Sequence, residues 1–138
     1  MGPVDPVRIA NTREWLLRVE EDLTSADRLI ESFSPLVRPA LFHCQQAVEK
    51  AFKAFLTWYD VPFRRIHVLE ELAAACLRLD PSLEALLARS TPLSAYAVRF
   101  RYPGAPYQPT LEEARAAEAI AREVFEAILA RLPGEVRP

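Results

Sequence analysis

The chain has 138 residues and a formal net charge of −2, and 51% of its residues are hydrophobic while 26% are charged. This length is sufficient for one domain with a buried core but too short for two ordinary domains, and the near-average composition excludes a disordered or fibrous chain. We therefore predict one domain over residues 1–138.

Charge and residue pattern also narrow the class of protein. No apolar run approaches the roughly 18 residues of a membrane span, and the N-terminus lacks the features of a signal peptide, so we expect a cytoplasmic protein that does not bind membranes. The small net charge gives no electrostatic footprint for long nucleic acids. Cys44 and Cys76 lack the spacing of a metal or redox pair. They are expected to be buried thiols, and no metal or cofactor site is predicted.

Two long helices are predicted in the first half of the chain. Asp5-Pro6 fits an N-cap followed by proline at the first helical position, and apolar residues then recur at helical spacing to about residue 33. Ser34-Pro35 interrupts this pattern, and a second helix is expected from about residue 36 to Tyr59. Asp60-Val61-Pro62 should end it, because proline disfavours helical geometry in the residue before it.

The second half of the chain predicts shorter helices and one long terminal helix. Thr110 and Glu113 form a capping-box pattern at the start of that last helix, which runs to about Leu132. No segment alternates apolar and polar residues as a strand would, so the fold class is all-α, an antiparallel up-down bundle of four to five helices. The elements expected between residues 60 and 110 are a helix at about 66–78, a short element at 81–87, one or two helical turns at 91–100 and a loop at 101–106.

Both lysines of the chain lie in one polar run of the second predicted helix, at residues 45–53. Glu49 precedes Lys53 by four residues, an ion-pair spacing worth only about 0.2–0.5 kcal/mol on an exposed helix. The run is therefore open to two interpretations, a solvated helix face or a binding site. At 100° per residue the opposite side of the helix is apolar, and one polar arc carries His43, Gln46, Lys50, Lys53 and Thr57.

Three stretches together resemble the HEPN family: Gln-Gln-Ala-Val-Glu-Lys-Ala-Phe-Lys-Ala at residues 45–54, Ile-His-Val-Leu-Glu-Glu-Leu at 66–72, and Arg-Tyr-Pro at 101–103. With the first helix ahead of them, their order and spacing cover nearly the whole chain. The family is a helical bundle, often dimeric, like the substrate-binding subunits of nucleotidyltransferases, and some members bind nucleotides or cleave RNA. The resemblance therefore implies a bundle with a polar groove and a protein partner.

The resemblance also implies nucleotide-binding residues. Val68 departs from the family pattern, in which an acidic residue commonly follows the histidine, so no adjacent carboxylate is expected to orient His67. Structural roles stay open as well, because His67 could cap the third helix and the Arg-Tyr-Pro turn could hold a loop to the bundle. The residues that match the family's motifs are Gln46, Lys50, Lys53, His67, Arg101 and Tyr102.

Ribonuclease members of the family use an arginine followed a few residues later by a histidine. The arginine would stabilise the charge of the phosphate, and the histidine would act as general base. No histidine follows Arg99 or Arg101. Arg38 and His43 have a suitable spacing, but the chain is so rich in arginine that composition alone nearly predicts such a match. This pair also lies at the start of the second helix, away from the family's position. Arg38 and His43 are therefore kept as an alternative, and no catalytic residue is predicted.

The predicted function is a non-catalytic module that binds a nucleotide and acts with a separately encoded minimal nucleotidyltransferase, for example in a toxin–antitoxin pair. We also expect a homodimer or larger assembly, because Trp15, Trp58 and the alanine-rich face of the last helix supply more packing surface than a small bundle needs. Two alternatives from other classes stay open: a ribonuclease toxin that cleaves RNA through Arg38 and His43, and a purely structural dimer.

Overall fold

A computed structural model describes residues 4–99, 103 and 107–138. The predicted all-α bundle is confirmed, and the described residues contain no strand. Among the described helices, none combines the length and the hydropathy needed to cross a membrane. The elements are α1 (Pro6–Glu31), α2 (Val37–Trp58), α3 (Leu69–Leu79), η1 (Pro81–Leu83), α4 (Glu84–Ser90), η2 (Thr91–Ala97), α5 (Leu111–Leu129) and η3 (Gly134–Val136).

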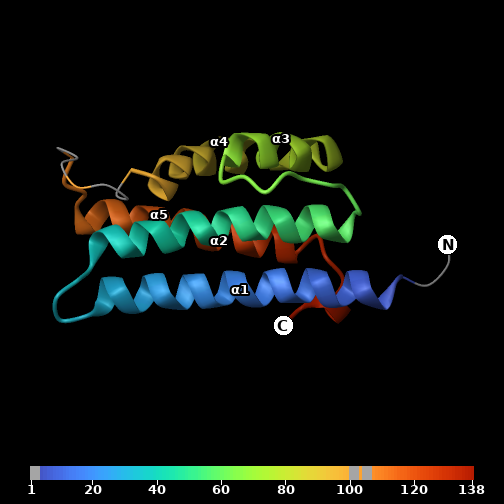
Figure 1. Cartoon of the computed structure of the whole chain (residues 1–138), viewed down its shortest axis with the longest axis horizontal. Helices are drawn as coiled ribbons and strands as arrows, with labels where there is room; N and C mark the ends of the chain where they lie inside the picture. The colour runs from blue at the N-terminus through green and yellow to red at the C-terminus, as the bar shows by residue number, and fades with distance from the viewer. Residues whose placement is uncertain (1–3, 100–102, 104–106) are drawn as a thin grey trace.

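Helix α2 is the central element of the bundle, packed against α1, α3 and α5 (Figure 1). Helices α1 and α2 form an antiparallel hairpin, in which the Arg8 guanidinium lies 5.3 Å from the centre of the Trp58 ring. The inner face of α2 supplies large side chains that solvent does not reach, including Phe52 and Leu56. The burial of apolar side chains of α1, α3 and α5 against α2 is the main contribution to the stability of the fold.

The segment 59–68 runs back along the bundle, so that α3 points in the same direction as α2 (Figure 1). Two contacts set this direction: Gln45 Nε2 lies 3.4 Å from the His67 carbonyl oxygen, and Cys76 Sγ lies 3.8 Å from the Phe52 carbonyl oxygen. This return segment is longer than the brief connections that the sequence suggested. It matters for the site because it lies beside the polar arc of α2.

The caps predicted at the start of α1 and the end of α2 are both present. Asp5 Oδ1 accepts a hydrogen bond of 2.9 Å from the Val7 amide. At the other end, Asp60 has a positive φ of 56°, its amide donates to the Thr57 carbonyl oxygen, and the Val61 amide donates to the Leu56 carbonyl oxygen. This pair of bonds is a Schellman motif, which satisfies the last carbonyl groups of the helix.

Asp60 should therefore tolerate glycine better than any branched residue. We expect Asp60→Gly to raise the free energy of unfolding by about 0.5–1 kcal/mol, because glycine adopts a positive φ without strain. Asp60→Val should lower it, since a β-branched side chain is strained in this conformation. Urea denaturation followed by circular dichroism measures both, and equal stabilities of the two variants would contradict this role of Asp60.

One local prediction, the start of α3, was wrong, and another, the capping box of α5, was confirmed only in part. Helix α3 begins at Leu69 rather than near residue 66, because the Leu69 amide is capped by the Ser94 hydroxyl at 3.0 Å, a residue from η2. The capping box of α5 is only half formed. Thr110 Oγ1 accepts from the Glu113 amide as expected, but the Glu113 carboxylate accepts from the hydroxyl groups of Tyr96 and Tyr107. Tertiary partners replaced the local ones in both cases.

Cys44 and Cys76 are fully buried in the core and are not bonded to each other. The prediction of buried free thiols is thus confirmed. Burial raises the pKa of each thiol to about 12. Neither thiol forms an appreciable amount of thiolate at neutral pH, and the thiolate is the reactive form of cysteine.

Candidate functional site

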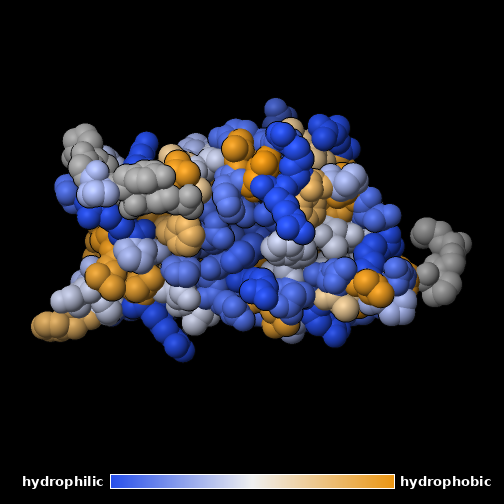
Figure 2. Space-filling model, in the orientation of Figure 1, coloured by the Kyte–Doolittle hydropathy of each residue, from blue (hydrophilic) through white to orange (hydrophobic). Residues whose placement is uncertain are grey.

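The polar arc of α2 lies between α1 and the return segment 59–68, and Figure 2 shows hydrophilic residues over the middle of this face. Side chains from all three elements meet there through direct hydrogen bonds. We call this group the polar cluster and define it as Asp22 of α1, His43, Gln45, Gln46, Glu49, Lys50 and Lys53 of α2, and His67 of the return segment.

Glu49 is the innermost member of the polar cluster, with only 2% of its side chain exposed. Its carboxylate accepts hydrogen bonds from Gln45 Nε2 at 3.1 Å, Lys53 Nζ at 3.0 Å and His67 Nδ1 at 2.9 Å. Burial alone raises the pKa of Glu49, but the hydrogen bonds from Gln45, His67 and Lys53 outweigh it and hold this pKa below its usual value. Glu49 is therefore a buried carboxylate ion held by three donors.

Lys53 is buried as well, so the interpretation of a solvated helix face is wrong for this residue. Its ammonium group lies 5.4 Å from the ring centre of Trp15 and 5.8 Å from that of Phe63, and these two rings pack edge to face. Trp15 of α1 and Phe63 of the return segment thus cover the Lys53–Glu49 ion pair. A cation between two aromatic rings is stabilised by their negative faces.

Asp22 forms the second centre of the polar cluster, on the side of α1. It accepts from His43 Nδ1 at 2.8 Å and from Lys50 Nζ at 2.6 Å. Sequence reasoning gave Asp22 no functional role. A signal was present, because a carboxylate on the inward stripe of α1, beside Val19 and Leu23, is buried only where it finds a partner.

The outer side of the polar cluster carries nitrogen groups, one ammonium group and two imidazole rings. The exposed fractions of the side chains are 20% for Lys50, 32% for His43 and 57% for His67, whereas Asp22 and Glu49 lie beneath them. Each histidine donates Nδ1–H to its carboxylate and leaves Nε2 outward, as an acceptor in the neutral ring and as a donor in the imidazolium form. Gln46 Nε2 donates to Gln45 Oε1 at 2.7 Å, and this bond holds the Gln46 side-chain amide between the two centres, Glu49 and Asp22.

A family model for the HEPN domain matches residues 12–132 of the chain. The chain belongs to the HEPN family. No curated protein and no solved structure matches it. HEPN membership agrees with the helical bundle and supports a module connected with nucleotides or RNA, and HEPN domains often act in oligomers or with partner proteins.

Four of the six residues that match the HEPN motifs come together in the polar cluster: Gln46, Lys50, Lys53 and His67. Arg101 and Tyr102 lie outside the residues that the structure describes. Although Val68 supplies no carboxylate beside His67, Glu49 of α2 takes that place at 2.9 Å. This partner could not be predicted from the sequence, because Glu49 is eighteen positions away.

The alternative ribonuclease residues have separate partners. Arg38 Nη2 donates to Gln108 Oε1 at 2.8 Å, whereas His43 donates to Asp22. Five positions along a helix turn a side chain by about 140°, so Arg38 and His43 leave α2 in different directions. His43 lies six positions before Glu49, the residue that binds His67. The two positions are about 9 Å apart along the axis of α2 and on different faces of the helix. His43 and His67 are therefore too far apart to act as an acid–base pair on one phosphate.

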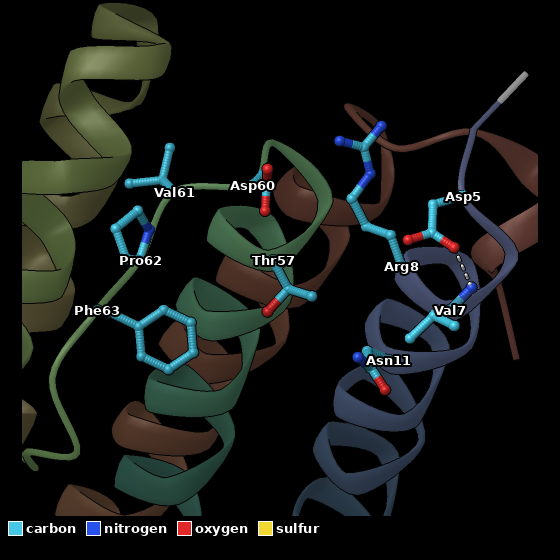
Figure 3. Close-up of a pocket in the computed structure, with 9 residues that line it drawn as sticks. All are labelled: Asp5, Val7, Arg8, Asn11, Thr57, Asp60, Val61, Pro62 and Phe63. Atoms are coloured by element: carbon cyan, nitrogen blue, oxygen red, sulfur yellow. Dashed lines mark hydrogen bonds between the residues drawn. The ribbon is translucent and has the colours of Figure 1, made fainter. Parts of the chain in front are cut away.

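A hollow of about 650 Å³ lies at the end of the bundle, between the start of α1 and the end of α2 (Figure 3). Asp5, the N-cap of α1, lines it together with Arg8 and Asn11 of α1, and Asp60 and Phe63 line it from the other side. Of the residues expected to bind a nucleotide, the four that the structure describes, Gln46, Lys50, Lys53 and His67, do not line this hollow. Within the part of the chain that the structure describes, no three histidine, cysteine or acidic side chains are placed to hold a metal ion.

Proposed function

We propose that this HEPN chain is a non-catalytic nucleotide-binding module that acts with a separately encoded minimal nucleotidyltransferase. The observation that carries the proposal is the layering of the polar cluster, with the carboxylates inside and Lys50, His43 and His67 at the surface. A ligand approaching from solvent first meets the Lys50 ammonium group and the Nε2 atoms of the two histidines, which donate when the imidazole carries both protons. Phosphate groups are anionic and rich in acceptors, and therefore suit this surface.

Lys50 is the main phosphate contact in this proposal. Its ammonium group has three N–H donors and gives one to Asp22, so it can bind a phosphate oxygen without losing that ion pair. His67 offers Nε2 from the other side of the polar cluster, and the Gln46 amide lies between them. Lys53 supports the site by holding Glu49, because the rings above it keep a ligand away.

On the motif match alone, the proposal also assigns Arg101 to a second phosphate contact and Tyr102 to a base contact. On α2 the outward nitrogen groups are spread over about 10 Å, from His43 to Lys50. An extended ligand suits this spacing better than a single phosphate ion does. ATP is therefore the probe of choice, because its phosphates and base can engage separate donors.

Lys50→Ala should weaken ATP binding at least tenfold, because a charged hydrogen bond to phosphate is worth about 1.5–3 kcal/mol. Isothermal titration calorimetry measures this change, and Arg115→Ala is the matched control, since Arg115 is an exposed cation on α5. The control should bind ATP as the parent protein does. Absence of ATP binding by the parent at millimolar concentration, or equal affinities of parent and Lys50→Ala, would exclude the proposed site.

One observation favours the ribonuclease alternative: Asp22 holds His43 by Nδ1 and leaves Nε2 outward, as in a general base. Against it, Arg38 donates to Gln108 and does not accompany His43. The same protein preparations incubated with single-stranded RNA distinguish the two functions. We expect the RNA to stay intact, and cleavage that disappears in His43→Ala would replace the proposed function with the alternative.

The partner in this proposal is a small nucleotidyltransferase, and its gene should lie beside the gene of this chain. Co-expression of the two proteins with a tag on one should recover both, whether or not nucleotide is present. A neighbourhood without such a gene would remove the support for this partner. If neither ATP nor RNA is bound, the remaining function is that of a structural dimer.

A further inference from the structure

Charged and polar side chains converge on the hollow of about 650 Å³ at the end of the bundle (Figure 3). Its volume lies within the range of small-molecule sites, about 300–1,000 Å³. No side chain of the polar cluster lines it, so a ligand bound here would not compete with a ligand at the proposed nucleotide site. The polar lining consists of Asp5, Arg8, Asn11, Thr57 and Asp60, and the apolar lining of Val7, Val61, Pro62 and Phe63.

Opposite charges in this hollow stay unpaired. Asp5 and Asp60 line it together with Arg8, yet within the described residues Arg8 forms no ion pair, and its Nε is buried without a hydrogen-bond partner. Other arginines of the bundle behave differently, since Arg64 and Arg89 each contact a glutamate, at 2.7 and 2.8 Å. A guanidinium group that stays unpaired beside two carboxylates is available to a ligand.

Local structure holds these charges apart. The Arg8 guanidinium lies 5.3 Å from the centre of the Trp58 ring, which restrains its position. Asp5 Oδ1 accepts from the Val7 amide as the N-cap of α1. Asp60 is held at the end of α2 by the Schellman motif, with a φ of 56°. Because none of these restraints needs a ligand, the charged groups are in place before one arrives, which lowers the ordering cost of binding.

Asp60 is an unfavourable residue for the fold at this position. Its charge lies at the C-terminal end of α2, which is the negative end of the helix dipole, and its positive φ suits glycine better than aspartate. Residues in such conformations cluster at functional sites. Recognition of a cationic group accounts for a carboxylate here, and the glycine substitution that should stabilise the fold would remove that contact.

We propose that this hollow binds a zwitterionic ligand of the amino-acid type, either a free amino acid or a dipeptide. The amino groups of Arg8 and the Asn11 amide would bind the carboxylate of the ligand. Asp60 and the Thr57 hydroxyl would bind its ammonium group, and Phe63 would contact its aliphatic body.

The charge of the hollow favours this class of ligand over others. Its two aspartates outnumber its one arginine, so the hollow repels a phosphate group, whereas a zwitterion has no net charge. A ligand with a single charge, such as a fatty acid or a simple amine, would leave either Arg8 or Asp60 without a partner. Only a ligand with both charges pairs with both residues.

The test is isothermal titration calorimetry of the parent protein without ATP, so that the result does not depend on the proposed nucleotide site. The probes are L-leucine, glycyl-L-leucine, L-leucinamide, which lacks the carboxylate, and 4-methylpentanoate, which lacks the ammonium group. At least one of the two zwitterions should bind with a dissociation constant of about 1 mM or lower. Each single-charge analogue should bind at least tenfold more weakly than leucine or its dipeptide, because it loses a charged hydrogen bond.

The two zwitterions distinguish a free amino acid from a dipeptide, since the one that fits the hollow binds more tightly. Failure of both to bind at about 10 mM overturns the inference. Equal affinities for all four probes also overturn it, because the hollow would then recognise only the aliphatic body.

Asp60→Asn places the ligand in the hollow, because asparagine keeps the size of the side chain and tolerates a positive φ. It should raise the dissociation constant of the zwitterion at least tenfold while the melting temperature stays close to that of the parent. Glu20→Gln is the matched control, since it removes an exposed carboxylate from the middle of α1, and it should bind as the parent does. Arg8→Gln should weaken binding of the zwitterion but not of leucinamide. Unchanged affinity in Asp60→Asn and Arg8→Gln would overturn the site.

Discussion

Replacement of Glu49 by glutamine should lower the free energy of unfolding by about 3–5 kcal/mol. The substitution removes the negative charge that Lys53 Nζ contacts at 3.0 Å, in a place where Trp15 and Phe63 exclude water. A buried ammonium ion without its counter-charge pays a large desolvation penalty. Urea denaturation at pH 7, followed by circular dichroism, measures the loss.

Glu71→Gln is the matched control for this prediction. Glu71 is also ion-paired, with Arg64 at 2.7 Å, but both side chains are exposed to solvent. Its replacement should change the free energy of unfolding far less than the replacement of Glu49 does, because solvent screens this pair. The double variant Glu49→Gln with Lys53→Met should be more stable than Glu49→Gln alone, because it removes the orphaned charge. Similar losses of unfolding free energy for Glu49→Gln and Glu71→Gln would mean that the buried pair of Glu49 and Lys53 contributes no more to stability than the exposed pair does.

The second large effect concerns acid. The parent protein should lose stability as the pH falls below about 4.5, and Glu49 should account for part of the loss. Burial raises the pKa of Glu49, but its three hydrogen-bond donors outweigh burial and leave this pKa lowered in the folded state. A carboxyl group of this kind stabilises the fold above its unfolded pKa, and the contribution disappears as the pH falls through the folded pKa.

Urea denaturation of the parent and of Glu49→Gln at several pH values between 7 and 3 measures this contribution. The difference in free energy of unfolding should be constant near neutral pH and should shrink below about 4.5, where Glu49 of the unfolded chain takes up a proton, until the pH falls through the lowered pKa of Glu49 in the folded state. Other carboxyl groups also change with pH: the Ser82 and Arg131 contacts lower the pKa of Asp80, and burial raises that of Glu118. They are present in both proteins and cancel in the difference. A difference that does not depend on pH would disprove the role of Glu49.

Helix type and order could be predicted from the sequence because local chemistry determines them. Asp5-Pro6 starts α1, and Asp60-Val61-Pro62 ends α2, through bonds among near neighbours in the chain. The start of α3 could not be predicted in the same way. Its first amide is capped by Ser94, twenty-five positions later, and only the folded chain brings the two together.

The candidate site could be predicted in part. Helical periodicity placed Gln46, Lys50 and Lys53 on one arc, and the structure keeps them there. Periodicity does not say what covers an arc. The burial of Lys53 and the role of Asp22 depend on α1 and on the return segment 59–68, which reach α2 only through tertiary packing. The charged residues were therefore identified, while their partners were not.

The two native cysteines make this chain a convenient background for spectroscopy. Both thiols are buried and have a pKa near 12, so maleimide reagents leave them unmodified in the folded protein. A cysteine introduced at any exposed position becomes the single reactive thiol. Fluorescent or spin labels can then be attached at one chosen site, and distances between labelled copies can be measured in solution without first removing a native residue.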